Sequence, residues 1–272
     1  MSKTILTREQ EQEIIEKYLS GRSKNSLRIE YQVSESTIGR ALKRNNIHIR
    51  QVDETNITKY NINHSFFDKN CINHNSAYVL GLIASDGWVS KVDNCICIEL
   101  KSDDIELLEK VNNALENERP IKTYSRKGRN DTSKLYFFSK KMKQDLAYFD
   151  IIPNKTYKTV DFAKNIPEEY FIDFVRGFFD GDGCITKCNS TLRWQLDGVS
   201  LDTLKTIQNR MIKYGLELKI REEKDPRSTI QKYRLYTYSK NSCLKIFELF
   251  YQESSSLKMK RKYEKFLDLL NE

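Results

Sequence analysis

One segment of this chain occurs twice, and this duplication limits the possible folds more than any other feature of the sequence. In each copy a glycine stands inside an apolar run that ends in Asp-Gly: AYVLGLIASDG at 77–87 and DFVRGFFDGDG at 173–183. Equivalent positions, such as Gly81 and Gly177 or Asp86 and Asp182, are 96 residues apart. A repeat of this length indicates two copies of one structural unit. We therefore expect a pseudo-two-fold arrangement.

The elements that follow each segment also repeat. After the first segment, the residue pattern predicts a hairpin at 88–100, a helix at 103–116, strands at 121–125 and 135–139, and a helix at 141–149. After the second, it predicts a hairpin at 184–199, a helix at 202–214, strands at 217–221 and 233–238, and helices at 244–251 and 260–270. Each half is predicted to be αββαββα in an α+β fold, with repeats at 73–160 and 161–272.

The two segments are predicted to be helices that pack against each other. Small residues fall on one face of each helix and would let the two backbones approach closely: Gly81, Ser85, Gly177 and Gly181. Asp86 and Asp182 would then emerge side by side where the helices end. Two adjacent carboxylates repel each other unless a cation lies between them. Because Mg²⁺ prefers oxygen ligands, we expect a Mg²⁺ site for which Mn²⁺ can substitute.

Residues 1–50 are predicted to form a separate helical unit. Thr7 and Gln10 form a capping-box pattern, and Val33, Ile38 and Leu42 define the inner side of a last helix near 35–45. This pattern resembles a helix-turn-helix of the recombinase and transposase type, whose alternative is a small bundle that binds protein. The hydroxyl and basic side chains left outside favour DNA: Ser36, Thr37, Arg40, Lys43 and Arg44. Residues 51–72 are expected to be a linker, with Phe66 and Phe67 docked on a neighbour.

Composition agrees with a nucleic-acid partner. The net charge is +8, and 31% of the residues are charged. Residues 119–143 contain nine Lys or Arg and one acid, Asp131. A single charge run is usually a solvated face, but a basic balance with runs that contain Tyr and Phe favours a polyanion. The six cysteines include no CxxC pair, so zinc is not expected. There is no apolar signal region and no segment of membrane-spanning length, so an intracellular, cytoplasmic protein is expected.

The duplicated segments resemble the double motif of LAGLIDADG homing endonucleases in their single-chain form. The resemblance covers 73–272 and rests on both acids, both interface glycines, the repeat spacing and the αββαββα order. Residues 59–67 resemble the lead-in of members with an N-terminal helix-turn-helix. The resemblance implies two sheets that form a saddle over the major groove of a long DNA site. It also implies metal-dependent cutting of both strands across the minor groove, which leaves four-base 3′ overhangs.

The resemblance also assigns residues to the site. It implies Asp86 and Asp182 as catalytic metal ligands, with Ser85 and Gly181 before them in the metal set. The catalytic lysines are matched by Lys260 in the second repeat and Lys155 in the first, with Lys158 as a rival. The earlier motif acid is Asp180 in the second copy but Ala84 in the first. That position is not an essential ligand in the family, and Asp180 alone would be interpreted as a solvated acid at a helix end.

The strands supply the remaining DNA-binding candidates. Arg and Gln read base edges, whereas Lys more often contacts phosphate. The first-half set is Lys91, Lys122, Tyr124, Arg126, Lys127, Arg129 and Lys134. The second-half set is Lys187, Arg193, Gln195, Lys219, Arg221, Lys232 and Arg234.

The main hypothesis is a monomeric, site-specific endonuclease for double-stranded DNA. A non-cleaving DNA-binding regulator is the first alternative, but such a protein would be expected to lose one motif acid, and both are present. An RNA maturase that assists intron splicing is the second alternative and would add intron RNA as a partner. The chain begins with Met1 and has no splice junction at its end, so we expect a free-standing protein encoded in an intron or a phage genome.

Overall fold

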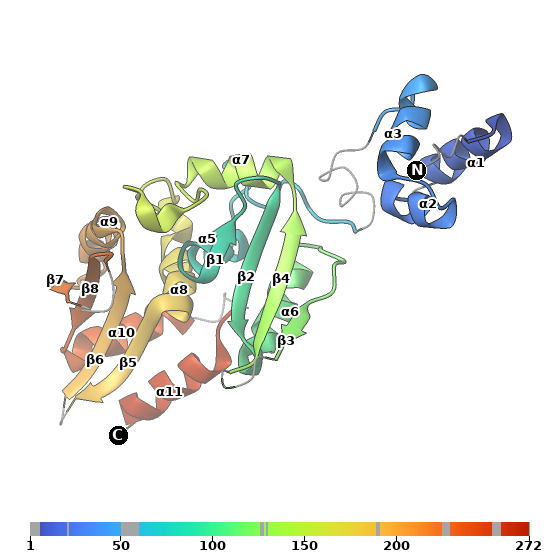
Figure 1. Ribbon diagram of the computed structural model, residues 1–272. Coiled ribbons are helices and arrows are strands. Elements are labelled where there is room, and N and C mark those ends of the chain that lie inside the picture. Colours follow the sequence, from blue (N-terminus) through green and yellow to red (C-terminus); the bar gives the residue numbers. More distant parts are fainter. Residues whose placement is uncertain are drawn as a thin grey trace. The chain divides into compact units, whose positions relative to one another are not determined.

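The computed structural model describes residues 6–20, 22–49, 60–125, 128, 130–188, 191–224, 229–251 and 257–271. The predicted Arg126, Lys127 and Arg129 therefore lie outside the described residues. The chain forms two compact units, residues 1–60 and 61–272 (Figure 1). In the described part of the chain, no helix has the length and apolarity needed to cross a membrane.

The first unit contains the helices α1 (Arg8–Leu19), α2 (Lys24–Glu30) and α3 (Glu35–Arg44). The predicted capping box of Thr7 and Gln10 starts α1, and Ser34 caps α3. Ile38 and Leu42 are buried in the small core, as predicted. The predicted outward residues of α3 are exposed, apart from the half-buried Thr37: Ser36, Arg40, Lys43 and Arg44. A DNA-binding helix-turn-helix stays a prediction for this unit.

In the second unit, the first repeat runs from α5 to α7. Its elements are α5 (His74–Asp86), β1 (Gly87–Val89), β2 (Cys95–Lys101), η1 (Ser102–Asp104), α6 (Ile105–Ala114), β3 (Lys122–Tyr124), β4 (Thr132–Phe138) and α7 (Lys140–Tyr148). The antiparallel sheet has the strand order β1-β2-β4-β3. The short turn η2 (Lys155–Tyr157) lies in the connection to the second repeat.

The second repeat has the same plan, with one additional helix. Its elements are η3 (Glu168–Tyr170), α8 (Phe171–Asp182), β5 (Gly183–Cys188), β6 (Thr191–Gly198), α9 (Leu201–Met211), η4 (Ile212–Tyr214), β7 (Lys219–Glu223), β8 (Lys232–Thr237), α10 (Lys240–Tyr251) and α11 (Lys260–Asn271). The sheet order, β5-β6-β8-β7, matches that of the first sheet. The predicted αββαββα repeat is confirmed.

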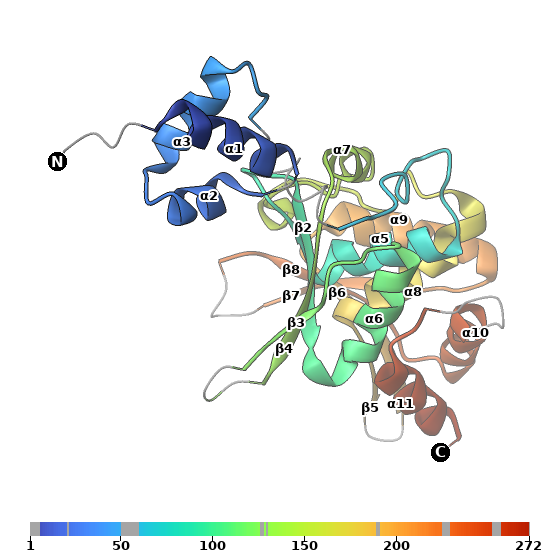
Figure 2. The same ribbon diagram turned by 90° about the vertical axis from the view of Figure 1, so that its right-hand side faces the viewer.

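The core of the second unit lies between the sheets and the helices. In the first sheet, Ile98 pairs with Leu135, and this face packs against α5 and α6. In the second sheet, Leu196 pairs with Leu235, and this face packs against α8 and α9. Figure 2 shows α5, α6 and α8 on one side of β2, β3 and β4. Phe66 and Phe67 are buried in this core, so their predicted docking is confirmed.

The opposite side of each sheet, which we call the outer face, is set by strand register because side chains alternate along a strand. In the first sheet, Glu99, Lys134 and Lys122 lie opposite one another across β2, β4 and β3. In the second sheet, Asp197, Arg234 and Arg221 form the matching row across β6, β8 and β7. The repeats therefore present matching rows that combine an acid with basic residues.

Candidate active site

The two motif helices, α5 and α8, pack with their backbones in contact. A Cβ atom added at Gly81 would lie 2.1 Å from the carbonyl oxygen of Phe174. A Cβ atom at Gly177 would lie 2.0 Å from the carbonyl oxygen of Tyr78. Because each clash is with backbone, no side-chain movement can relieve it. The two glycines therefore permit the close approach that the sequence predicted.

This approach brings the ends of the two helices together. Asp86 is the last residue of α5, and Asp182 is the last residue of α8. A Cβ atom at Gly181 would lie 1.9 Å from Oγ of Ser85 and 3.0 Å from Oδ2 of Asp86. The end of α8 therefore contacts Ser85 and Asp86 at the end of α5.

Both acids sit in surroundings that disfavour their charge. Burial, followed by repulsion from Asp182, raises the pKa of Asp86 to about 6, against the attraction of Lys262 and Lys155. Asp182 reaches solvent, but the protein packed around it raises its pKa, and Lys262 and Lys155 oppose this rise. Two carboxylates that destabilise each other in this way need positive charge nearby.

The donor set fits a hard divalent cation. Asp86 and Asp182 supply carboxylate oxygens, the ligand type that Mg²⁺ takes, and their mutual repulsion would be relieved by a cation between them. Within the described residues, no group of three His, Cys, Asp or Glu side chains is placed to hold a metal ion. The carboxylate pair would therefore leave positions for water or phosphate oxygens.

The two residues that precede the acids already have hydrogen bonds. The Ser85 hydroxyl donates within its own helix, to the carbonyl oxygens of Gly81 at 3.2 Å and Leu82 at 3.1 Å. The carbonyl oxygen of Gly181 accepts from Nζ of Lys262 at 2.9 Å. A metal role for Ser85 or Gly181 stays a prediction.

Each repeat places one lysine at the end of its motif helix. Nζ of Lys155 donates to the carbonyl oxygen of Gly87. Nζ of Lys262 donates to the equivalent Gly183 oxygen at 2.7 Å, and also to Phe179 at 2.8 Å and Gly181 at 2.9 Å. Burial lowers the pKa of both lysines, and the nearby aspartates oppose this shift.

The second-repeat lysine beside the acids is Lys262, not the predicted Lys260. The Lys260 side chain is 70% exposed, and its Nζ is 3.9 Å from the Glu264 carboxylate. Two residues along a helix correspond to a rotation of about 200°, so these lysines point in different directions. A signal was present in the sequence, since Lys262 lies one helical turn before the buried Phe266. The rival Lys158 lies just after η2, and the structure favours Lys155 by its contact with Gly87.

Asp180 is fully buried, so its interpretation as a solvated acid is wrong. Its Oδ2 accepts from the Tyr78 hydroxyl at 2.6 Å and from the backbone N–H of Met259 at 2.8 Å. Its Oδ1 has no hydrogen-bond partner among the described residues. Sequence reasoning missed this contact because Met259 is distant in the chain.

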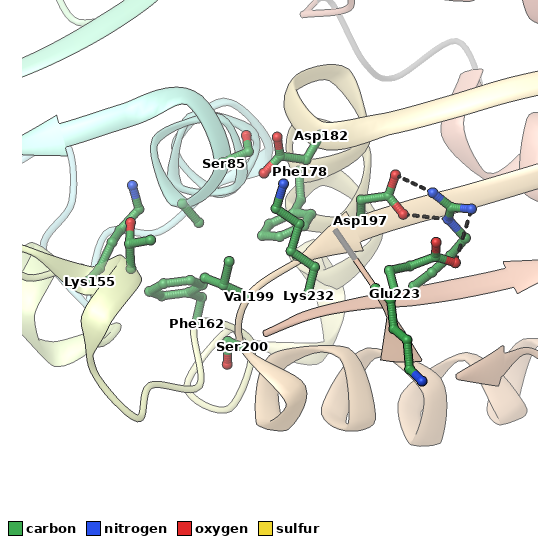
Figure 3. Close-up of a pocket in the computed structure, with 15 residues that line it drawn as sticks. Ser85, Lys155, Phe162, Phe178, Asp182, Asp197, Val199, Ser200, Glu223 and Lys232 are labelled. Carbon is green, nitrogen blue, oxygen red and sulfur yellow. Dashed lines mark hydrogen bonds and ion pairs between the residues drawn. The ribbon is translucent and has the colours of Figure 1, made fainter. Parts of the chain in front are cut away.

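A cavity of about 840 Å³ opens beside Asp182 on the outer face of the second sheet (Figure 3). Phe162 and Phe178 line its apolar part, and Asp182 and Lys155 lie at its motif-helix side. Lys232 extends from β8 toward Asp182 in Figure 3, and its charge opposes the rise in the pKa of Asp182. The cavity thus connects Asp182 with the predicted DNA-binding strands of the second sheet.

Most of the predicted strand residues in the described part of the chain share the outer faces. In the first sheet these are Lys122, Tyr124 and Lys134. In the second they are Arg193, Gln195, Lys219, Arg221, Lys232 and Arg234. Lys91 lies in the β1–β2 connection. Lys187 differs, because it pairs with the buried Leu192 on the core-side register and does not share the face of Arg193.

Acids on these faces hold the basic side chains in place. Glu99 pairs with Lys134 at 2.7 Å, and Asp197 pairs with Arg234 at 2.6 Å. Glu223 adds a second contact to Arg234 at 3.1 Å. Strand register, which the sequence alone does not give, places Glu99 opposite Lys134 and Asp197 opposite Arg234.

Several solved structures resemble the chain, all at low identity. I-DmoI in complex with DNA and Ca is 16% identical, covers 73% of this chain and 98% of its own, and gives a TM-score of 0.49. The LAGLIDADG meganuclease I-AabMI bound to uncleaved DNA is 12% identical, covers 74% and 91%, and gives 0.45. Full-length WhiA from Thermatoga maritima is 14% identical, covers 75% and 64%, and gives 0.47.

The family comparison matches the two repeats. An uncharacterized protein of Methanocaldococcus jannaschii is 29% identical over 163 residues, which are 54% of this chain and 54% of that relative. The chain therefore spans about half the length of this curated relative. The family model of the LAGLIDADG-like domain matches residues 73–162 and 169–250, which together make up more than half of the chain. As its two motif helices and paired acids indicated, this chain belongs to the LAGLIDADG-like domain family.

Proposed function

We propose that this protein is a metal-dependent, site-specific endonuclease for double-stranded DNA. The observation that carries the proposal is the juxtaposition of Asp86 and Asp182 across a helix pair that only glycine allows, with a lysine at each helix end. A repressor needs no such pair of mutually destabilising carboxylates. A bound Mg²⁺ or Mn²⁺ ion would supply Lewis-acid chemistry toward a phosphodiester and water.

The residues of the chain itself would position the reacting groups. Asp86 and Asp182 would hold the divalent cation, and their proximity is fixed by the helix contact at Gly81 and Gly177. Lys155 faces the cavity beside Asp182 and would stabilise negative charge on a bound phosphate. Lys262 would act less directly, since its ammonium already donates to three carbonyl oxygens.

The outer faces would bind the DNA. They carry Lys and Arg in both repeats, and Arg and Gln side chains suit base edges in the major groove. Because the acid pair lies at the junction of the two repeats, each sheet would contact one side of a long target. The family resemblance implies cutting of both strands with four-base 3′ overhangs. In the first unit, the exposed α3 residues would add a second, smaller contact with DNA.

Cleavage of a randomised duplex library in Mg²⁺ tests the proposal, with Asp86→Asn and Asp182→Asn as the site variants. We expect cutting at one long sequence, and a loss of about 1,000-fold or more in each variant, since removing a single transition-state contact already costs that order. Asp103→Asn is the matched control, because Asp103 is an exposed acid outside the site. It should cut at the wild-type rate.

Other outcomes separate the alternatives. Selective binding of one duplex without cutting in Mg²⁺ or Mn²⁺ would contradict the endonuclease proposal and favour a DNA-binding regulator. Acceleration of intron splicing by the protein, with no duplex cut, would favour the maturase alternative. Cutting that survives in both aspartate variants would place the chemistry elsewhere.

A further inference from the structure

The buried Asp180 joins three parts of the second unit. Its Oδ2 accepts from Tyr78 in α5 at 2.6 Å and from the backbone N–H of Met259 at 2.8 Å. Asp180 itself lies in α8, two residues before Asp182. One carboxylate oxygen thus links both motif helices to the segment that leads into α11.

Met259 in turn fixes the first turn of α11. Its carbonyl oxygen accepts from the backbone N–H of Lys262 at 3.1 Å and of Tyr263 at 3.0 Å. The Lys262 side chain then reaches back to the end of α8 and donates to three carbonyl oxygens. A continuous series of hydrogen bonds therefore runs from Asp180 through Met259 to Lys262.

A second buried contact holds the preceding residues. Nε of Arg176 donates to the carbonyl oxygen of Leu257 at 3.1 Å, and Nη1 donates to that of Phe250 at 2.8 Å. Arg176 is 2% exposed and also pairs with Asp173 at 2.8 Å. Two residues of α8 therefore hold the chain on either side of residue 258. Arg176 holds Leu257, and Asp180 holds Met259, which is nearer to Lys262.

The first repeat has no equivalent of the link from Asp180 through Met259 to Lys262 among the described residues. Ala84 occupies the position equivalent to Asp180, and Phe174 occupies the position equivalent to Tyr78. Lys155 reaches Gly87 without a carboxylate that accepts from the segment before it, as far as the described residues show. The contrast indicates that Asp180 positions the lysine of the second repeat only.

We propose that Asp180 is a positioning residue that seats Met259 and thereby fixes Lys262 at the end of the second motif helix. The expected effect of Asp180 on DNA cleavage rests on the proposed endonuclease function. The seating of Met259 and Lys262 rests on the hydrogen bonds alone. Asp180 is fully buried and therefore closed to a bound phosphate, so its effect would pass through Lys262. A displacement of about 1 Å at a catalytic site can cost about 100-fold in rate.

Acetylation of lysines by an N-hydroxysuccinimide ester, measured by mass spectrometry, tests the geometry without any activity. In the unaltered protein Lys262 should label slowly because it is 8% exposed and hydrogen-bonded. Asp180→Ala should raise the labelling rate of Lys262 by about tenfold or more, because Met259 loses its buried acceptor. Lys260, which is exposed, gives the reference rate in both proteins.

Three variants separate positioning from general loosening. Asp180→Asn keeps an oxygen for Met259 and should restore slow labelling of Lys262. Tyr78→Phe removes the other donor to Oδ2, and it should leave Lys262 protected. In Asp180→Ala, Lys155 should stay as protected as in the unaltered protein. An equal rise at Lys155 and Lys262 would indicate unfolding of the whole unit and would overturn the proposal.

Hydrogen exchange adds a measurement that needs no variant. The Met259 amide should exchange slowly in the unaltered protein, and fast exchange there would overturn the proposal even if Asp180→Ala failed to fold. Unchanged Lys262 labelling in a folded Asp180→Ala protein would also overturn it. With the target duplex, Asp180→Ala should reduce the single-turnover rate by about 10- to 100-fold at unchanged DNA affinity. If the unaltered protein cuts no DNA, the labelling result still decides the seating of Lys262, so the two proposals fail separately.

Discussion

The two repeats share one backbone plan but secure their lysines differently. In the first repeat, Lys155 faces the cavity and donates to the carbonyl oxygen of Gly87. In the second, Lys262 donates to three carbonyl oxygens and is 8% exposed. A lysine whose donors are all engaged stabilises the fold, whereas one beside an open cavity is available to a ligand. Each repeat therefore places a lysine at the end of its motif helix, but the two lysines differ in hydrogen bonding.

The difference also shows where symmetry is required. Gly81 and Gly177 are equivalent and make equivalent backbone contacts, so the helix pair tolerates no divergence there. Ala84 and Asp180 are equivalent too, but only the second contacts a C-terminal segment. The two contact glycines are therefore the same in both repeats, whereas the position of Ala84 and Asp180 differs together with its surroundings.

Alanine substitutions at the two helix glycines should have the greatest effect, and they test whether the two glycine contacts are equivalent. Gly81→Ala and Gly177→Ala should each cost about 3 kcal/mol or more of unfolding free energy, because the added Cβ meets backbone. Urea unfolding followed by tryptophan fluorescence measures this loss, since Trp88 and Trp194 both belong to the second unit. Gly198→Ala is the control, because its Cβ would lie 3.7 Å from Phe178, an ordinary contact. A clear difference between the two helix glycines would break the symmetry argument.

Replacing each lysine by methionine tests the difference in hydrogen bonding between Lys155 and Lys262. Lys262→Met should cost about 2–3 kcal/mol of unfolding free energy, because buried carbonyl oxygens lose their donor. Lys155→Met should cost about 1 kcal/mol, because its described hydrogen bonding is limited to one carbonyl oxygen. The same urea titration measures both. Equal losses would show that Lys155 is as structural as Lys262.

The two acids should differ in the stability of the metal-free protein. Asp86→Asn should raise the unfolding free energy by about 1 kcal/mol, or about 2–4 °C in melting temperature, because it removes a charge that burial and Asp182 disfavour. The pKa of Asp86 is raised from 3.8 to about 6, so the ionised form destabilises the fold. The gain should therefore be absent below pH 3.8, grow as the pH rises, and be complete above about 6.

Asp182→Asn should give a smaller gain, because Asp182 reaches solvent. Thermal melts from pH 3.5 to 8 in a chelator measure both variants, with Asp103→Asn as the exposed control. A loss of stability in Asp86→Asn above pH 6 would contradict the repulsion argument.

The smallest effect concerns the outer faces. Glu99→Gln and Asp197→Asn each remove an acid that pairs with a basic residue, Lys134 or Arg234. Each variant should tighten non-specific duplex binding by about two- to fivefold and steepen its salt dependence, because a cation becomes available to phosphate. The gain should be smaller for Asp197→Asn, since Glu223 still pairs with Arg234. Fluorescence anisotropy across a salt series measures both, and weaker binding would show that these acids orient the DNA contacts.

The sequence predicted most of the fold because local patterns specify helices and strands one at a time. The residue patterns after each repeated segment predicted the αββαββα order. The repeated segment itself predicted the close approach of the motif helices and the pairing of Asp86 with Asp182. The sequence named the strand candidates as a group without assigning their faces, and the strand register separates Lys187, which pairs with Leu192, from the rest. The choice of Lys260 failed because a match between sequence segments carries no information about helix rotation.

The amino-acid sequence alone specifies the two repeats and the acids at their contact, because repeat spacing and small residues act through the backbone. The position of Lys262 beside these acids and the contacts of Asp180 depend on tertiary packing. Lys262 reaches the site because α11 packs with the side of Phe266 inward, and Asp180 is buried because Tyr78 and Met259 meet it from distant parts of the chain. Such contacts depend on how whole elements pack, and a hydrogen bond between residues 79 positions apart leaves no local pattern.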